Sequence, residues 1–352
     1  MKVGKRIISI LLVVLLLSTL AACGNSTANP STKPSANPSA SPSANDSKPT
    51  VKISLAHNLA VGSVMDQTAN KFAELCAEKS DGRIKVTVYP AAQLGNERDM
   101  LEGIQMDTID MMLATTAYLA NLESAFSVLD LPFIFDDVDH VKACLDGEVG
   151  QQLSKILSDN QGLKILTYLN SGFRVMLTKN TKLENLDSFK GLQMRSPETP
   201  VYVQMFKALG AAPTPIPFSE VYTAIQTGVV EGVEVSPDLM YTMKFHEVGK
   251  YIARTNHIFT TVVPLVSNKY WNSLDADTQR IIKEAWAEVA AWEWGEYEGA
   301  NEVAIGEMAK AGIAVNDIDR ASLREACTTV YDEFAKQNST IADLINKIQG
   351  AR

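Results

Sequence analysis

The sequence predicts an α/β fold divided into two lobes. From Val51 onward, short segments that alternate apolar and polar residues are followed by segments with helical periodicity, as in α/β sheet proteins. About 300 residues follow position 50, which is more than one hydrophobic core usually supports. A helical pattern without proline runs from Asp275 to about Lys310. At about 1.5 Å per residue this helix would be roughly 50 Å long, so we expect it to span both lobes.

The first 22 residues have the pattern of an export signal. Three basic residues precede the apolar run Ile7–Leu17, and the run ends in Leu-Ala-Ala before Cys23. The run is shorter than the roughly 20 residues that a spanning helix needs. The Cys after these small residues resembles a bacterial lipobox, which predicts a lipidated Cys23 on the outer face of the cell membrane. An ordinary signal peptide with an incidental Cys is the alternative.

Residues 23–50 are expected to form a disordered linker, because they are rich in Ser, Pro and Ala and contain no large apolar side chain. Residues 51–352 carry 27 basic and 40 acidic side chains, a net charge of −13. This balance argues against a nucleic-acid partner and against attraction to anionic lipid. Cys76, Cys144 and Cys327 remain, and an odd number gives no disulfide framework. Cys76 lies on an apolar helix face and is expected to be buried.

The elements can be assigned in order. Val51–Ala56 predicts a strand and Val64–Lys79 a helix. Arg83–Tyr89 predicts a second strand, and Asn96 then caps a helix, with Asp99 completing a capping box. We expect largely parallel sheets. The further strands predicted are Ile109–Leu113, Lys164–Leu169, Phe173–Thr178, Leu192–Arg195, Gly232–Val235 and Thr261–Val266.

Signatures of catalysis or metal binding are absent from the sequence. It has no GxSxG elbow, P-loop or HExxH motif, and no Cys pair at zinc-like spacing. The four histidines are scattered, without a second ligand three or four residues away. Trp286, Trp292 and Trp294 on the long helix would suit sugar stacking, but Trp292 and Trp294 do not share a helix face, which favours packing. We therefore expect no enzyme, no cofactor and no metal.

Polar residues at the predicted strand ends indicate a binding cleft, because ligands of open α/β sheets bind outside the carboxyl ends of strands. Arg174 also lies within an otherwise apolar strand, where burial without a partner would be costly. For either arginine alone a structural salt bridge is the alternative. Together they suggest an anion site, since a guanidinium matches a carboxylate. The strand-end residues are His57, Asn58, Thr115, Thr116, Arg195, Ser196, Val235 and Ser236.

Several segments resemble the TRAP transporter solute-binding proteins in order and spacing over residues 51–345. The most specific is Pro217–Gly232, which reads PFSEVYTAIQTGVVEG. The others are YPAAQLGNER (Tyr89–Arg98), FSVLDLPF (Phe126–Phe133), GFR (Gly172–Arg174), KGLQMR (Lys190–Arg195) and ALGAAPTP (Ala208–Pro215).

The resemblance implies a two-lobed, periplasmic-binding-protein-like fold with a hinge, crossing strands and a long helix across both lobes. It places lobe I at residues 51–171 plus about 261–300, and lobe II at 172–260 plus about 301–352. It implies that Arg195 forks onto a ligand carboxylate and that Arg174 adds a contact. Further contacts are implied for Phe218, Glu97, His57, Asn58 and Thr115.

One segment departs from the family pattern. Relatives typically read Asp-Gly-x-Glu-Asn-Pro where this chain has Glu231–Pro237, so Val235 stands at the position of the Asn that donates to the ligand. Either Ser236 substitutes for that amide, or the ligand carries a less polar group there.

The resulting expectation is a TRAP substrate-binding subunit that captures a small organic acid and delivers it to membrane permease subunits. A sugar acid is favoured, with dicarboxylates and keto acids as alternatives. An ABC-type binding lipoprotein, a ligand sensor and a surface hydrolase are the rival functions.

Overall fold

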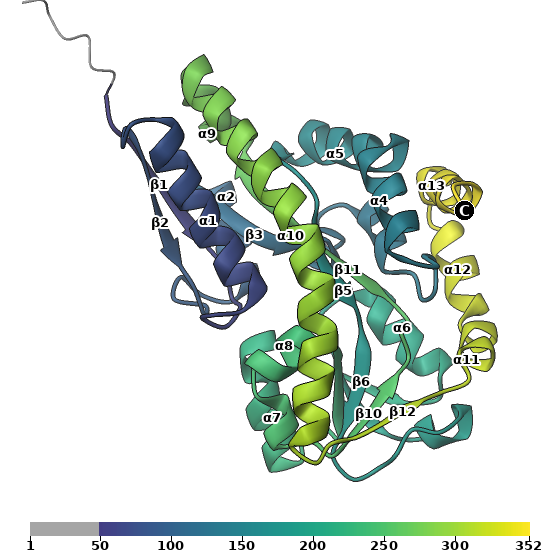
Figure 1. The fold of residues 1–352 in the computed structure, drawn as a ribbon. Coiled ribbons are helices and arrows are strands. Elements are labelled where there is room, and N and C mark those ends of the chain that lie inside the picture. The colour runs from purple at the N-terminus through teal and green to yellow at the C-terminus, as the bar shows by residue number, and fades with distance from the viewer. Residues whose placement is uncertain (1–48) are drawn as a thin grey trace, which may run out of the picture. The chain divides into compact units, whose positions relative to one another are not determined.

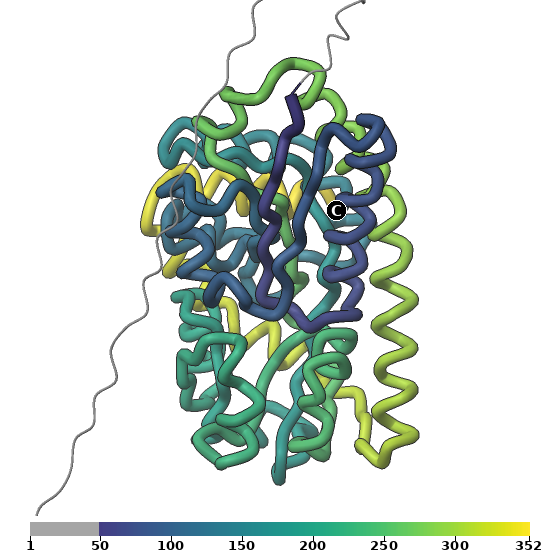
Figure 2. Tube along the Cα trace, turned by 90° about the vertical axis from the view of Figure 1, so that its left-hand side faces the viewer, coloured from purple at the N-terminus to yellow at the C-terminus, as the bar shows by residue number. Residues whose placement is uncertain are grey.

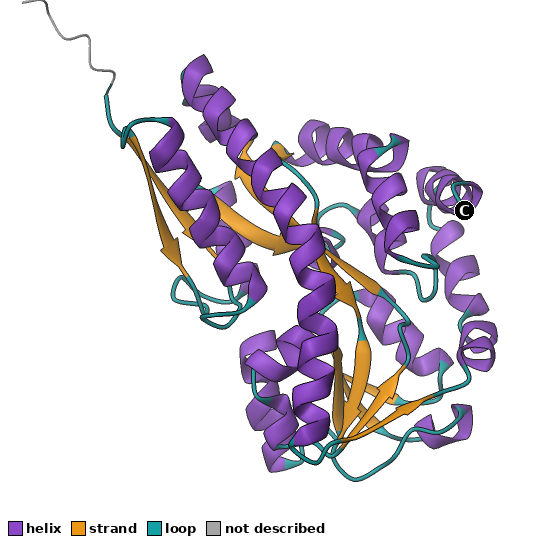
Figure 3. Ribbon diagram, viewed as in Figure 1, coloured by secondary structure: helices purple, strands orange, loops and turns teal. Residues whose placement is uncertain are grey.

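A computed structural model describes residues 49–352. The predicted signal peptide, Cys23 and nearly all of the predicted linker lie outside these described residues. The described chain forms an α/β fold with two mixed sheets of six strands each (Figures 1 and 3). Among the described helices, none combines the length and the apolar content that crossing a membrane requires.

The first sheet has the order β2-β1-β3-β11-β4, with β5 also paired to β11. Strands β1, β2 and β3 are parallel, whereas β11 runs antiparallel to β3, β4 and β5. The expectation of largely parallel sheets is therefore wrong, because β11 returns to this sheet from the other one. The strands are β1 (Val51–Ala56), β2 (Ile84–Tyr89), β3 (Met111–Thr115), β4 (Leu163–Ile165), β5 (Leu169–Phe173) and β11 (Phe259–Ser267).

The second sheet has the order β12-β10-β6-β9-β7-β8 and is also mixed. Strands β7, β8 and β9 are parallel, and β6 is antiparallel to both β9 and β10. The strands are β6 (Val175–Thr178), β7 (Gln193–Ser196), β8 (Ala212–Pro215), β9 (Gly232–Val235), β10 (Tyr251–Arg254) and β12 (Ala314–Asp317).

Helices cover both sheets. The predicted capping box of Asn96 and Asp99 is present at the start of α2. Beside the first sheet lie α1 (Val64–Lys79), α2 (Glu97–Gln105), α3 (Thr116–Leu119), η1 (Ser124–Asp130), α4 (Val138–Asp146), α5 (Glu148–Gln161) and α9 (Asn268–Ser273). The second sheet is accompanied by η2 (Leu186–Phe189), α6 (Pro200–Ala208), η3 (Phe218–Glu220), α7 (Val221–Thr227), α8 (Pro237–Thr242) and η4 (Phe245–Glu247). The chain ends in α11 (Arg320–Ala326), α12 (Thr328–Ala335) and α13 (Ser339–Gly350).

The long helix α10 (Ala276–Lys310) has 35 residues and connects the two lobes (Figures 1 and 2). It packs against α1 in one lobe and against α8 in the other. Trp286 is buried and stacks on Phe72 at 4.1 Å between ring centroids, while Trp294 stacks on Phe259 at 6.0 Å. The partly buried Trp292 ring lies beneath the Lys71 ammonium. The tryptophans thus serve in packing and in surface contacts.

The chain passes between the sheets at three places. Strand β5 ends at Phe173 and β6 begins at Val175, β10 ends at Arg254 before β11 begins at Phe259, and α10 leads to β12. Gly172 lies at the first crossing with φ +78°, and a Cβ there would lie 2.4 Å from the Asn301 amide nitrogen. Only glycine fits this position without rearrangement.

The strands change sheet close to the predicted lobe boundaries. Helix α13 belongs to the predicted lobe II, but it contacts η1 and α5 beside the first sheet. The assignment of residues to lobes stays a prediction.

Candidate ligand-binding site

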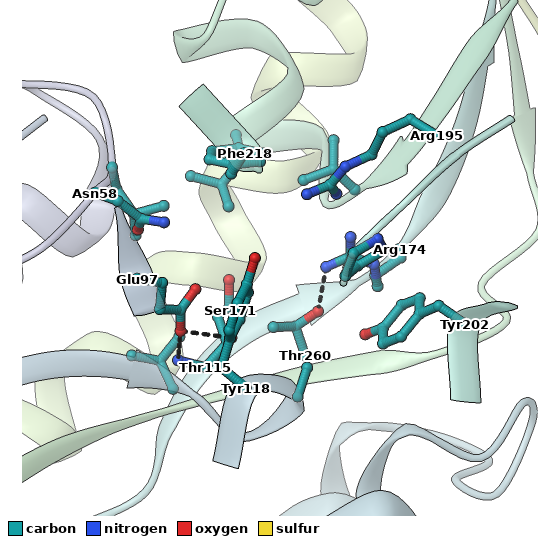
Figure 4. Close-up of a pocket in the computed structure, with 16 residues that line it drawn as sticks. Asn58, Glu97, Thr115, Tyr118, Ser171, Arg174, Arg195, Tyr202, Phe218 and Thr260 are labelled. Carbon is teal, nitrogen blue, oxygen red and sulfur yellow. Dashed lines mark hydrogen bonds between the residues drawn. The ribbon is translucent and has the colours of Figure 1, made fainter. Parts of the chain in front are cut away.

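A cavity of about 40 Å³ lies between the two lobes, beside the strands that cross between them (Figure 4). Figure 4 shows Arg174 and Arg195 on one side and Asn58 and Glu97 on the other. The lining residues are Asn58, Leu59, Glu97, Thr115, Ala117, Tyr118, Ser171, Arg174, Arg195, Pro197, Tyr202, Phe218, Val235, Leu239, Thr260 and Val262.

Arg195 lies on β7 and is 2% exposed. Its Nε donates to the Ile216 carbonyl at 3.0 Å, and the guanidinium lies 5.8 Å from the centre of the Phe218 ring. No carboxylate among the described residues forms a salt bridge with it. Burial lowers the pKa of Arg195 to about 10, although nearby Glu234 opposes this. In the part of the chain that the structure describes, the cavity wall thus carries a buried cation without a salt-bridge partner.

Arg174 also lines the cavity, but its charge is compensated. It lies at the junction of β5 and β6, not inside one continuous strand as predicted. Its Nε and Nη2 both bind the Glu234 carboxylate, with 2.8 Å between Nη2 and Oε1. Nη2 also donates to the Glu234 carbonyl at 2.7 Å, and Nη1 donates to Thr260 at 2.8 Å. Most of its donors are therefore bound to protein atoms.

The Arg174–Glu234 pair belongs to a buried polar cluster. Burial alone would raise the pKa of Glu234, but Arg174 beside it lowers that pKa below its ordinary value. The His257 ring lies 3.4 Å from the same carboxylate. Next to this pair, Tyr202 donates to Asp130 at 2.8 Å, and burial raises the pKa of Asp130 to about 7.

Glu97 provides the acidic group of the opposite wall. It is the first residue of α2 and is buried. The backbone N–H of Thr115 donates to its Oε1, as does the Thr115 hydroxyl at 2.7 Å. Burial raises the pKa of Glu97 to about 7, against the opposing effects of Thr115 and Arg195.

Seven of the nine ligand-contact residues named from the sequence line the cavity, and His57 and Ser236 do not. The His57 ring accepts from the Leu59 N–H at 3.3 Å and lies 3.3 Å from Asp66, so it stabilises the loop that follows β1 next to the cavity. The Ser236 hydroxyl is 3.4 Å from the Tyr297 hydroxyl and is buried. The residues that line the cavity are Asn58, Glu97, Thr115, Arg174, Arg195, Phe218 and Val235.

Sequence reasoning missed the hydroxyl-bearing lining residues Tyr118, Ser171, Tyr202 and Thr260. Thr260 directly precedes a predicted strand, and Tyr118 follows the polar pair at the end of another. Those positions were the available signals, but they do not show which side chains face the cavity.

Glu198 closes one edge of the site. Arg98 Nη2 and the Tyr118 hydroxyl each lie 3.3 Å from its carboxylate, and the Asn121 amide donates to its carbonyl at 3.3 Å. These contacts join the two lobes beside the cavity.

Metal-binding clusters are not found among residues 49–352. Cys76, Cys144 and Cys327 are free and buried, as expected for Cys76.

Comparison with known proteins identifies the family. Residues 55–338 match the model of the bacterial extracellular solute-binding proteins, family 7 (DctP). The chain is 34% identical over 292 residues to the C4-dicarboxylate-binding periplasmic protein DctP of Rhodobacter capsulatus, covering 82% of this chain and 87% of that protein. It is 30% identical over 301 residues to the 2,3-diketo-L-gulonate-binding periplasmic protein YiaO of Escherichia coli, covering 83% and 92%.

A solved structure has the same fold. The sugar acid binding protein DctPAm of Advenella mimigardefordensis, in complex with galactonate, matches with a TM-score of 0.83 and 28% identity, over 86% of this chain and 99% of that one. The chain therefore belongs to the DctP family of TRAP transporter solute-binding proteins, which bind solutes and are not enzymes.

Proposed function

We propose that this protein is the substrate-binding subunit of a TRAP-type secondary transporter, capturing a small organic acid between its lobes and delivering it to the membrane permease subunits. The observation that carries the proposal is Arg195, a buried guanidinium without a salt-bridge partner among the described residues. A buried charge without a partner costs stability, and a ligand carboxylate would supply that partner. The planar guanidinium can give a carboxylate two parallel hydrogen bonds.

Capture is coupled to closure of the lobes. Arg195 and Phe218 come from one lobe and Asn58 and Glu97 from the other, so a ligand touching both stabilises the closed arrangement. A nearly complete shift from open to closed requires a difference in binding of about 5.5 kcal/mol. Expelling water at closure strengthens the charged hydrogen bonds to the ligand. The permease would then recognise the closed form.

The names of the relatives support a small organic acid as the ligand. Their names specify a C4-dicarboxylate, a diketo sugar acid and galactonate. Sugar acids, which the sequence analysis favours and which include the galactonate bound by a relative, are the first class to titrate. Dicarboxylates and keto acids remain the alternatives.

The site of action is proposed to be extracytoplasmic. Two relatives are named as periplasmic proteins. The Leu-Ala-Ala-Cys sequence ending at Cys23 supports an anchor in which the mature chain begins at a lipidated Cys23. Mass spectrometry of the N-terminal peptide from membranes would test this, because an unmodified Cys23 or cleavage elsewhere contradicts the anchor.

The binding role is tested by calorimetric titration of the purified protein with sugar acids, keto acids and dicarboxylates. Arg195→Ala should weaken binding of the preferred acid by roughly a hundredfold or more, because it removes the charge that desolvates with the carboxylate. Arg254→Ala is a matched control, since Arg254 pairs with Glu302 at the surface. An unchanged dissociation constant in Arg195→Ala would contradict the proposed site.

A further inference from the structure

The hydroxyl groups that line the cavity are already held by the protein. Each of the five has a protein partner. Thr115, Tyr118 and Tyr202 use their hydroxyl protons in these bonds, so their oxygens can accept from a ligand hydroxyl but these groups cannot donate to a ligand oxygen. The bonds are Thr115 to Glu97 at 2.7 Å, Tyr118 to Glu198 at 3.3 Å, Ser171 with Tyr297 at 3.1 Å, Tyr202 to Asp130 at 2.8 Å, and Arg174 to Thr260 at 2.8 Å.

Thr260 differs from Thr115, Tyr118 and Tyr202, which donate their hydroxyl protons to carboxylates. Its hydroxyl oxygen accepts from Arg174, which leaves the hydroxyl proton to donate, and the described residues provide no acceptor for it. One further ligand oxygen can therefore be bound beside the arginines.

Much of the remaining lining is apolar. Val235 at the end of β9 is 1% exposed, and Leu59, Phe218, Leu239 and Val262 also contact the cavity. The neighbouring polar side chain, Ser236, faces Tyr297 and not the cavity. A ligand hydroxyl placed against this wall would lose its water without gaining a partner.

The charges of the lining favour a single carboxylate. Arg195 lacks a counter-ion among the described residues, whereas the charge of Arg174 is matched by Glu234. The opposite wall carries Glu97. A second carboxylate would find no uncompensated cation in the lining and would be repelled by Glu97 when that group is ionised.

The size of the cavity favours a compact ligand. A water molecule needs roughly 10–15 Å³ of such space, so the cavity of about 40 Å³ holds only a few groups of that size.

We propose that the ligand is a short monocarboxylic acid with one further oxygen next to the carboxylate and an apolar end, namely a 2-oxo or 2-hydroxy alkanoic acid. The carboxylate binds Arg195, the second oxygen binds Thr260, and the alkyl end contacts Val235 and Leu239. This inference rests on the proposed organic-acid function and replaces the sugar acid with a less polar class.

Five acids with the same four-carbon chain provide the test: butanoate, 2-oxobutanoate, 2-hydroxybutanoate, D-erythronate and succinate. In calorimetric titrations of the purified protein, 2-oxobutanoate or 2-hydroxybutanoate should bind at least about tenfold more tightly than the other three. Erythronate adds two hydroxyl groups at the end expected against the apolar wall, succinate adds a second charge, and butanoate leaves Thr260 unpaired. Galactonate is titrated in parallel as a six-carbon sugar acid.

Val235→Thr tests the apolar wall, because threonine has nearly the shape of valine and adds one hydroxyl. It should shift the affinity ratio of 2-oxobutanoate to erythronate by about tenfold toward erythronate. Val233→Thr is the matched control, since Val233 is buried two residues earlier in β9 but does not line the cavity. Its affinity ratio should stay at the wild-type value, and the unfolding midpoint shows whether each variant is folded.

The outcomes separate this inference from the proposed function. If erythronate, galactonate or succinate binds most tightly, and Arg195→Ala abolishes that binding, the proposed function stands and the ligand class is wrong. Equal affinity ratios in Val235→Thr and wild type would contradict the role of the apolar wall. Absence of binding for every acid, galactonate included, would overturn both.

Discussion

The surroundings of Arg174 and Arg195 differ although both arginines are buried in the wall of one cavity. Arg174 is bound through three of its nitrogens and is paired with Glu234, whereas Arg195 gives one hydrogen bond to a carbonyl and has no described counter-ion. A fully paired buried charge holds protein segments together. An unpaired one destabilises the empty protein and is available to a ligand. The number of partners, not burial, thus distinguishes Arg174 from Arg195, the arginine that we propose binds the ligand.

The largest effect that would test this comparison is on the free energy of unfolding without ligand. Arg174→Met should lower it by about 3–5 kcal/mol, because Glu234 would remain buried without its partner. Arg195→Met should leave it unchanged or raise it, since that variant removes an unpaired buried charge. Chemical denaturation measures both. Equal losses of unfolding free energy in the two variants would show that Arg195 has a structural partner, and would contradict the distinction between the two arginines.

A second test concerns the pH dependence of ligand affinity. Glu97 has a pKa raised to about 7 by burial, and a bound anion would raise it further. Binding would then take up a proton above pH 7, so affinity should fall as pH rises, by up to about tenfold per pH unit. Titrations between pH 6 and 9 measure this.

Glu97→Gln should remove most of this dependence, and Asp130→Asn is the matched comparison, because Asp130 has a similar pKa beside Arg174. A flat profile in the wild type would exclude Glu97 as the linked group.

The buried polar cluster around Arg174 should also make the free energy of unfolding depend on pH, in two opposite directions. The pKa of Asp130 is raised to about 7, so its contribution is fully present below about pH 4 and is lost as pH rises through 7. The pKa of Glu234 is lowered, so its contribution is present above its ordinary pKa and is lost on acidification. For Asp130, the difference between its ordinary pKa of 3.8 and about 7 corresponds to roughly 4 kcal/mol.

Asp130→Asn should remove only the loss between about pH 4 and 7, as followed by denaturation at each pH. If that variant kept the wild-type profile, Asp130 would not be the titrating group.

The smallest expected effect is at the edge of the site. Glu198→Gln weakens the partly exposed contact to Arg98 and should lower affinity only a few-fold, through faster dissociation, because such ion pairs contribute about 0–1 kcal/mol. Stopped-flow measurement of ligand release would show it. A hundredfold faster release would mean that closure depends on this contact more than on Arg195.

Much of the fold could be predicted from the sequence where the signals are local. The bounds of β1, α1 and β9 and the capping box at Asn96 agree with the structure. Strand β8 was not predicted from the sequence, because two of its four residues are proline. An edge strand tolerates proline, but such a segment shows no alternation of apolar and polar residues. The antiparallel course of β11 depends on long-range pairing, which no local pattern encodes.

For the site, strand ends and arginines indicated the right region. The resemblance added Phe218 and Glu97. The sequence could not show that Glu234 compensates Arg174, because these two residues are distant along the chain. It also could not show that His57 turns toward Asp66, because that contact depends on a local turn.

The three passages between the lobes also determine how the molecule can move. Two strand crossings and one continuous helix connect the lobes, and the C-terminal helices add a further link, because α12 contacts α6 and α13 contacts η1. These connections restrain sliding and twisting of one lobe against the other, so we expect opening to be mainly a rotation about the crossings. The separation between Asn121 and Glu198 should therefore measure the opening angle, and a pair of spectroscopic labels placed beside them would report ligand occupancy one molecule at a time.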